Sequence, residues 1–417
     1  MTFQNTLAFA QSLDKSDPLS KFQSEFLFPM HNGEKAIYFC GNSLGLQPKS
    51  ARAAINAELD YWETYGVEGW FSGDKPWLSY HQELSERAAP IVGAKPSEVI
   101  VMNTLTVNLH LMMVSFYRPT PQRFKIIMEA GAFPSDQYAL ETQVRFHGFD
   151  PSVAIVEIAP RDGEHCLRTE DIVQTIENQG DTVALVLFGG VNYYTGQFYD
   201  LEKIAEAARK IGATVGFDLA HAAGNVPLQL HDWQADFAVW CGYKYLNSGP
   251  GGISGAFIHE KHHNNKDLPR FAGWWGHDEQ QRFKMEKGFI PMSGAAGWQL
   301  STVQVLPSAM HRASLRLIEQ AGGIGVLRQK SVQLTAFLEF ILKETKQNFE
   351  IITPSVSEKR GAQLSILTDE NGKKLFDKLA ANGVICDWRE PNVIRLAPVP
   401  LYNSFKDVWR VGQLLKG

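Results

Sequence analysis

The chain has 417 residues and a formal net charge of −5, with 44% hydrophobic and 20% charged residues. This length exceeds what one hydrophobic core usually organises, so at least two domains are expected. The mildly acidic balance argues against a nucleic-acid partner, which selects a strong basic excess. No apolar run approaches the ~18 residues that a membrane span needs, so we expect an enzyme that acts on a small-molecule substrate.

The cysteines and the N-terminus bear on the cellular compartment. Four cysteines lie far apart without a CxxC pair, which predicts neither a disulfide framework nor a zinc site. They are Cys40, Cys166, Cys241 and Cys386. The first residues, MTFQNTLAFAQSLDKSD, lack the basic region and long apolar segment of a signal peptide. We therefore expect a cytoplasmic protein. His262 and His263 are typical of a solvated loop, and no metal site is expected.

Short apolar runs alternate with helical patterns between residues 98 and 260. Most runs are rich in Val, Ile and Phe without polar alternation, as strands buried on both faces should be. They span 98–103, 124–133, 182–191, 212–221, 236–243 and 255–260. The helical stretch 201–212 places Leu201, Ile204, Ala205 and Ala208 along one face and ends at Gly212. This alternation predicts an α/β domain with a mostly parallel sheet.

The pattern changes after residue 310. A long amphipathic stretch from Ser331 to Lys346 predicts a helix. It is followed by strand 361–367, helix 373–382, strands 383–388 and 392–397, and a helix from Asn403. This pattern predicts a smaller α+β domain. We expect an N-terminal segment (1–55) that packs with this small domain, a large domain (56–315) and the C-terminal small domain itself (316–417).

Lys244, in the stretch WCGYKYLNSGPGG (240–252), follows an apolar run that is typical of a buried strand. A surface lysine just past a strand end is one interpretation. The alternative depends on Asp218 and His221, which end another apolar run, because ligands bind beyond the carboxyl ends of parallel strands. A lysine that forms a Schiff base and a carboxylate that keeps a pyridine nitrogen protonated are what pyridoxal phosphate (PLP) requires. Burial would lower the pKa of this lysine and make its amine nucleophilic.

Two stretches are candidates for the site that binds the phosphate of such a cofactor. Residues 103–116 start polar and become an apolar-striped helix, whose N-terminus has free N–H groups beside the hydroxyl of Thr104 or Thr106. The second stretch, AFPSD (132–136), offers Phe133 to stack on the ring and Asp136 to meet a polar edge. Each also has an interpretation without a ligand, as a helix cap and as a core aromatic before a turn.

The stretch FDLAHAAGNVPLQLHDWQADFAVWCGYKYLNSGPGGISGAFIHEK (217–261) resembles the kynureninase family, whose members are PLP enzymes of the aspartate-aminotransferase fold. Further stretches agree in order. They are YFCGNSLGLQPK (38–49), LTVNLHLMM (105–113), AFPSDQYA (132–139), YYTGQ (193–197), GWWGH (273–277), RGAQLSI (360–366) and RLAPVPLYNSF (395–405). The resemblance implies hydrolysis of L-kynurenine, or its 3-hydroxy form, to L-alanine and anthranilate or 3-hydroxyanthranilate. It also implies a homodimer with shared active sites, in tryptophan catabolism or NAD biosynthesis.

The resemblance further implies the roles of individual residues. Lys244 would hold PLP and move the Cα proton, Asp218 would pair with the pyridine nitrogen, and Tyr243 is a candidate general acid–base. Arg395 would bind the substrate α-carboxylate. The other implied residues are Leu105, Thr106, Phe133, Pro134, Ser135, Asp136, His221 and Thr302 for the cofactor, Trp274 from the partner subunit, and Ser43 and Trp70 for the substrate.

Three positions depart from the family pattern. Thr302 stands where relatives often have asparagine, Gly189 where some have a serine that contacts the cofactor, and Trp70 where some have histidine. The first and third bear on the pocket for the substrate ring, so the preference between kynurenine and its 3-hydroxy form stays open.

Three alternatives compete with this interpretation. Another PLP lyase of the same fold, such as a cysteine desulfurase-like enzyme, needs a reactive cysteine on a mobile loop, whereas Cys241 and Cys386 lie in predicted strands. A catalytically inactive relative would usually lose the lysine or its acidic partner, and both are present. A nicotinamide-dependent dehydrogenase would carry a GxGxxG motif, which this sequence lacks.

Overall fold

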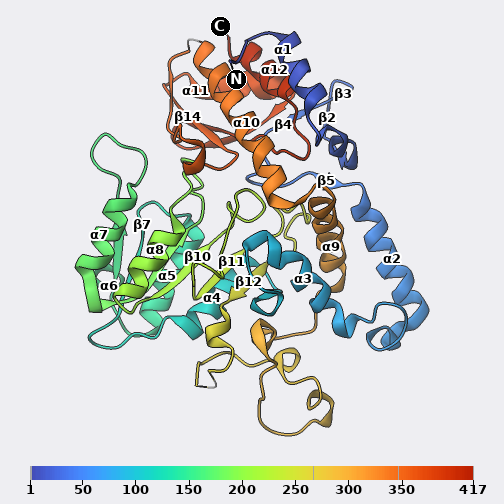
Figure 1. Ribbon diagram of the computed structural model, residues 1–417, viewed down its shortest axis with the longest axis vertical. Coiled ribbons are helices and arrows are strands. Elements are labelled where there is room, and N and C mark those ends of the chain that lie inside the picture. Colours follow the sequence, from blue (N-terminus) through green and yellow to red (C-terminus); the bar gives the residue numbers. More distant parts are fainter. Residues whose placement is uncertain (1, 266, 346, 417) are drawn as a thin grey trace.

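The computed structural model describes residues 2–265, 267–345 and 347–416. A large body is built around one sheet, and a smaller body above it contains both ends of the chain (Figure 1). Within the described ranges, no helix combines the length and the apolar character needed to cross a bilayer.

A seven-stranded sheet organises the large body, with strand order β6-β12-β11-β10-β9-β7-β8. Its strands are β6 (Val99–Val101), β7 (Lys125–Glu129), β8 (Ile155–Ile158), β9 (Val183–Gly189), β10 (Thr214–Asp218), β11 (Phe237–Trp240) and β12 (Gly255–Ile258). β12 is antiparallel to both neighbours, and the remaining pairs are parallel. The predicted mostly parallel sheet is confirmed. β8 was not predicted.

The strands are apolar throughout because both faces of the sheet are covered. In β9, Val186 and Phe188 pack into the core on one face, whereas Leu185 and Leu187 pack into the core on the other. The first face is covered by α3 (Tyr80–Val92), α7 (Thr169–Gln179), α8 (Leu201–Lys210) and α9 (Val305–Gln320), against which α2 (Ser50–Tyr65) packs. The second face is covered by α4 (Leu105–Phe116), α5 (Pro134–Phe146) and α6 (Pro151–Ala154).

Helix α8 has the predicted pattern. Leu201, Ile204, Ala205 and Ala208 are all buried. Gly212 lies just beyond the helix end at φ +69°, in the left-handed region that glycine enters without steric cost.

The small body is an antiparallel sheet with order β13-β14-β17-β16, packed against helices. Its elements are α10 (Gly323–Glu344), β13 (Phe349–Ile351), β14 (Leu364–Thr368), α11 (Gly372–Ala381), β15 (Val384–Ile385), β16 (Asp387–Arg389), β17 (Val393–Leu396) and α12 (Phe405–Leu415). The predicted helix from Ser331 begins earlier, at Gly323, and its predicted last residue, Lys346, lies outside the described residues. The single strand predicted over 383–388 is wrong. The chain forms two short strands there, because β15 pairs with β4 and β16 pairs with β17.

The N-terminal segment lies mostly against the small body. It comprises α1 (Leu7–Ser16), β1 (Phe26–Leu27), β2 (Met30–His31), β3 (Glu34–Lys35), β4 (Ile37–Tyr38) and β5 (Gln47–Pro48). Ala10 and Leu13 of α1 share a core with Val408 and Val411 of α12. The division at residues 1–55, 56–315 and 316–417 stays a prediction.

After β4, the segment crosses to the large body. The Gly45 N–H donates to the Tyr243 carbonyl over 2.8 Å. A Cβ atom at position 45 would lie 2.4 Å from the Lys244 carbonyl oxygen, so only glycine allows this close approach. The N-terminal segment therefore packs directly on the loop that carries Lys244.

Candidate active site

The carboxyl ends of the central strands open into one cavity. Asp218 is the last residue of β10, Gly189 ends β9 and Glu129 ends β7, while Lys244 follows β11. The cavity is lined by Leu105, Thr106, Glu129, Phe133, Ser135, Asp136, Gly189, Val191, Tyr193, Asp218, Ala220, His221, Tyr243 and Lys244. The structure thus brings together residues that the sequence predicted from four separate stretches.

Lys244 is a buried cation in this cavity, with only 8% of its surface exposed. Its Nζ atom lies 3.0 Å from Nε2 of His221 and 5.8 Å from the centre of the Phe133 ring. Burial lowers the pKa of His221 well below its usual value, and the charge of Lys244 adds to this effect. His221 is therefore a neutral imidazole whose Nε2 accepts a hydrogen bond from the Lys244 ammonium.

Two predicted carboxyl groups face the lysine. Asp218 accepts a hydrogen bond from the Ala220 N–H over 2.7 Å, while burial raises its pKa. Burial, and then the charge of Asp218, raise the pKa of Asp136 well above its usual value. The buried Oδ1 atom of Asp136 has no hydrogen-bond partner among the described residues. Such an orphaned acceptor is rare in a native interior and indicates a partner supplied by a ligand.

Two helices begin at the cavity. Helix α4 starts at Leu105, and its N-cap residue Thr104 makes no side-chain capping bond, so the first N–H groups stay free for an anion. Helix α5 starts at Pro134, with Ser135 and Asp136 in its first turn. Pro134 shapes this turn without lining the cavity itself.

Tyr243 and Tyr193 form another part of the wall. Burial raises the pKa of Tyr243, so this phenol holds its proton and is better suited to donating it than to accepting one. Tyr193 packs edge-on against Phe133, with ring centres 5.2 Å apart. Sequence reasoning missed Tyr193 and Glu129. Glu129 lies inside the predicted run 124–133, and only the structure shows that the strand ends there, as β10 ends at Asp218.

Arg395 lies on β17 of the small body and is fully buried. Its Nη1 donates to the Tyr193 carbonyl over 2.6 Å, and its Nη2 donates to Oγ of Ser43 over 3.2 Å. Nη2 also forms an ion pair with Asp387, which pairs with Arg389 as well. Burial lowers the pKa of Arg395 to about 10. The predicted residues Arg395 and Ser43 thus lie together, one residue away from the cavity.

Three further predicted residues, besides Pro134, Ser43 and Arg395, do not line the cavity of their own chain. Trp274 is 46% exposed and donates through Nε1 to the Arg282 carbonyl over 3.1 Å. Thr302 is exposed in the loop before α9. Trp70 packs edge-on against Trp275, with ring centres 5.2 Å apart. Their assignment to a site stays a prediction, and for Trp274 that prediction requires a second chain.

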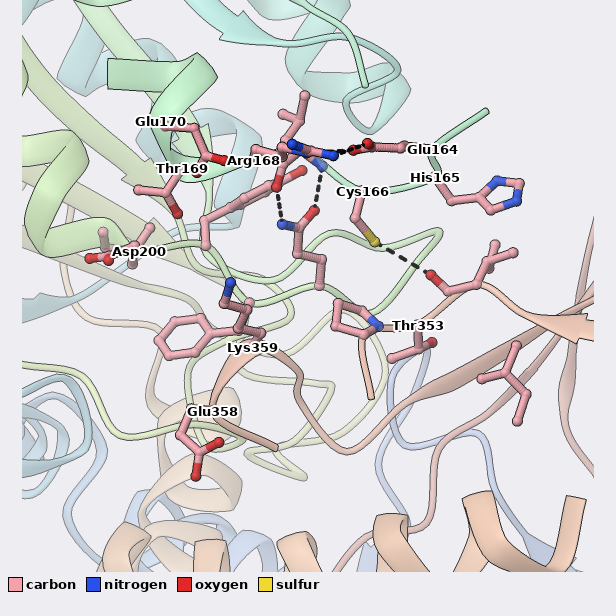
Figure 2. Close-up of a pocket in the computed structure, with 18 of the residues that line it drawn as sticks. Glu164, His165, Cys166, Arg168, Thr169, Glu170, Asp200, Thr353, Glu358 and Lys359 are labelled. Atoms are coloured by element: carbon pink, nitrogen blue, oxygen red, sulfur yellow. Dashed lines mark hydrogen bonds and ion pairs between the residues drawn. The ribbon is translucent and has the colours of Figure 1, made fainter. Parts of the chain in front are cut away.

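A larger hollow lies between the two bodies and contains none of the predicted site residues. Figure 2 shows Arg168 paired with Glu164, and the Cys166 thiol facing the Ile352 carbonyl, 3.4 Å away. Burial raises the pKa of Cys166 to about 11. Among the described residues that line this hollow, no buried side-chain nitrogen or oxygen lacks a hydrogen-bond partner, in contrast to Oδ1 of Asp136. The hollow has no comparable chemistry.

Solved structures define the class of protein. The apo cysteine desulfurase of Thermococcus onnurineus NA1 has a TM-score of 0.74 at 19% identity, over 97% of each chain. A C-DES mutant with glycine covalently linked to its PLP cofactor has a TM-score of 0.77 at 18% identity, over 91% of this chain and 96% of that one. The fold is therefore that of the PLP-dependent enzymes.

Full-length relatives then define the family. The kynureninase of Flavobacterium psychrophilum is 58% identical over 420 residues, covering 100% of this chain and 99% of that protein. The kynureninase of Nematostella vectensis is 51% identical, covering 98% of this chain and 92% of the relative. A family model described as the kynureninase C-terminal domain matches residues 327–415. The chain belongs to the kynureninase family.

Proposed function

We propose that the chain hydrolyses L-kynurenine to anthranilate and L-alanine with PLP as its cofactor, and that it also accepts 3-hydroxy-L-kynurenine. Relatives named kynureninase match the chain over its full length. The observation that carries the proposal is the burial of Lys244, Asp218 and Asp136 around one cavity at the carboxyl ends of the sheet. The orphaned Oδ1 of Asp136 and the uncapped start of α4 fit a ligand with a hydrogen-bond donor and a phosphate.

The residues predicted for the cofactor have the following proposed roles. Bound PLP supplies an electron-poor ring that accepts the electron pair released at the substrate Cα. Lys244 would hold the cofactor covalently until the substrate amine displaces it, and its freed amine would then take and return the Cα proton. Asp218 keeps the proton on the pyridine nitrogen. The N–H groups at the start of α4, with the hydroxyls of Thr106 and Tyr243, hold the phosphate. The remaining contacts are Phe133, Pro134, Ser135, Asp136 and His221.

Arg395 would anchor the substrate α-carboxylate, with Ser43 beside it. Two observations support this: the guanidinium is one residue from the cavity, and its Nε atom is buried without a partner among the described residues. A carboxylate would supply the missing acceptor through a bidentate contact. Tyr243, whose phenol keeps its proton, is the candidate acid that would deliver a proton to Cβ of the alanine product once the Cβ–Cγ bond of the substrate is hydrolysed.

The activity test is direct. The purified chain, loaded with PLP, is incubated with each of the two kynurenines, and fluorescence of the anthranilate products is recorded. Lys244→Ala is the matched control, which should lose both turnover and the visible absorbance band of the cofactor. A chain that binds PLP and forms no aromatic amine from either compound refutes the proposal.

A homodimer with shared active sites is also part of the proposal. Support comes from exposed aromatic and apolar side chains gathered on and beside the protruding segment 271–290, where Phe283 contacts both Phe71 and Trp274 at ring distances of 5.6 and 5.5 Å. Patches of this kind usually mark interfaces. In such a dimer, Trp274 would close the partner's phosphate site, while Thr302 and Trp70 keep the cofactor and substrate roles that the family resemblance implies.

Subunit mixing tests the shared sites. The Lys244→Ala chain, inactive alone, and the Trp274→Ala chain, weakly active alone, should regain activity when unfolded and refolded together, because one mixed site then has both native residues. If the refolded mixture stays at the sum of the separate activities, Trp274 does not act across subunits.

A cytoplasmic location and a role in tryptophan catabolism or NAD biosynthesis complete the proposal, and they rest on family membership. The alternative, a cysteine desulfurase-like activity, lacks an activated thiol. Burial raises the pKa of all four cysteines, Cys40, Cys166, Cys241 and Cys386, whereas a nucleophilic thiol requires a lowered pKa.

A further inference from the structure

Glu129 is a third carboxyl group in the cavity, and no role has been given to it above. It is the last residue of β7 and is 5% exposed. It lines the same cavity as Asp136 and Asp218, on the side where β9 ends. Its position at a strand end, beside the groups that would hold the cofactor, makes it a candidate member of the site.

Backbone contacts fix the carboxyl group of Glu129. The Gly189 N–H donates to Oε1 and Oε2 over 3.1 and 3.2 Å. A Cβ atom at position 189 would lie 2.8 Å from Oε1, so the carboxyl group occupies the space that a side chain at this position would need. One N–H group satisfies only part of the hydrogen-bonding capacity of a carboxyl group, and the rest faces the cavity.

The charges around Glu129 disfavour its ionised form. The titratable groups facing it are Asp218 on β10, Asp136 on α5, Tyr199 after β9, and His221 and Lys244 across the cavity. Lys244 is the one cation lining the cavity among the described residues, and its Nζ contacts His221. Burial, and then Asp218, raise the pKa of Glu129 to about 7. Three buried carboxyl groups that share one ammonium are not all ionised at neutral pH.

We propose that Glu129, in its neutral acid form, is an additional cofactor-binding residue whose O–H group donates a hydrogen bond to an oxygen of bound PLP. This inference rests on the proposed function, because it requires PLP in the cavity. A carboxyl group kept neutral by its surroundings is an effective donor to an anionic oxygen. The same group becomes an acceptor beside an anion once it ionises, and cofactor affinity then falls.

The test is the pH dependence of cofactor affinity, measured by equilibrium dialysis of the holoenzyme against graded PLP and read from the visible absorbance band. Between pH 6 and 8, the wild-type dissociation constant should rise about tenfold as Glu129 ionises. Glu129→Gln has an amide that donates at every pH and still accepts from the Gly189 N–H. Its affinity should stay near the wild-type value at pH 6 and lose most of this dependence. The other groups that line the cavity are the same in both proteins, so the ratio of the two constants isolates Glu129.

Glu157→Gln is the matched control, since Glu157 is an exposed glutamate on the neighbouring strand β8, paired with Met128. Its pH dependence should match the wild type. If Glu129→Gln also matches the wild type, the inference is wrong, whereas kynurenine turnover by the wild type leaves the proposed function intact. Should Glu129→Gln fail to fold, infrared difference spectra of the wild-type holoenzyme between pH 6 and 8 test the inference instead. A protonated-carboxyl band that titrates near pH 7 supports the inference, and its absence overturns it.

Discussion

Replacing Gly45 with alanine should damage catalysis from outside the cavity. The added Cβ would lie 2.4 Å from the Lys244 carbonyl oxygen and 2.3 Å from Oδ1 of Asn247. The first contact is with backbone, which cannot rotate away. Relief to an ordinary contact of 3.4 Å requires the loop 243–247 to move by about 1 Å. That loop carries Lys244, so the amine moves with it.

The expected damage has two parts, a loss of folding stability and a loss of catalytic rate. Overpacking of this kind costs typically 1–3 kcal/mol, and a weakened bond from the Gly45 N–H to the Tyr243 carbonyl adds about 1 kcal/mol. A misplacement of about 1 Å at a reacting group can lower the rate by about 100-fold. We therefore expect Gly45→Ala to lose about 2–4 kcal/mol in the free energy of unfolding and about 100-fold in kcat/KM.

Urea unfolding and kynurenine turnover measure the two effects, and Gly325→Ala is the matched control. Gly325 lies in α10 with ordinary helical φ, and a Cβ atom there would point into open space among the described residues. Alanine at this position should stabilise the fold by up to about 1 kcal/mol and leave turnover unchanged. If Gly45→Ala retains wild-type turnover and stability, the N-terminal segment does not determine the position of the lysine loop.

Further predictions concern the cavity and the core. Asp218→Asn should keep PLP, as seen in the visible band, while kcat falls roughly 100-fold or more because the ring nitrogen loses its anionic partner; near-normal kcat excludes that role. Arg395→Ala should raise KM roughly 100-fold with a smaller change in kcat, and an unchanged KM contradicts carboxylate binding. Burial lowers the pKa of His311 to about 4, below its unfolded value of about 6.5. This histidine therefore stabilises the fold above pH 6.5, and its contribution is lost as the pH falls toward 4. Its share of the loss between pH 6.5 and 5 is about 2 kcal/mol, so urea unfolding of His311→Gln should depend less on pH than that of the wild type; equal slopes contradict this assignment.

Local patterns predicted much of the fold. Runs of Val, Ile and Phe identified six of the seven strands of the large sheet, because burial on both faces leaves a continuous apolar signature. The same apolar signature does not indicate the direction of a strand, and β12 is antiparallel to its neighbours. The stretch 383–388 was wrong as one strand because its two halves pair with different partners, and pairing between distant segments leaves no local signal.

The same distinction between local patterns and distant contacts explains which site residues could be predicted. Lys244, Asp218 and Asp136 each end or follow a buried strand, which is why sequence reasoning found them and why the structure brings them together. The ion pair between Asp387 and Arg395, and the bond from Arg395 to Ser43 across 352 positions, come from tertiary packing and were not predicted as contacts. Trp274 could be named only through the family resemblance, since its proposed role lies in another chain.

Tyr193 lies between the cavity that contains Lys244 and the buried Arg395 of the small body. Its ring borders the cavity beside Phe133, and its carbonyl holds Nη1 of Arg395. Gln363 braces the same carbonyl through Nε2 over 3.0 Å, so this residue is tied to the small body as well. One residue therefore sets the distance between Lys244, the proposed reacting amine, and Arg395, the proposed anchor of the substrate carboxylate. A homologue of the substrate with one extra methylene between its amine and its carboxylate would not span that distance correctly, however well its aromatic ring fitted.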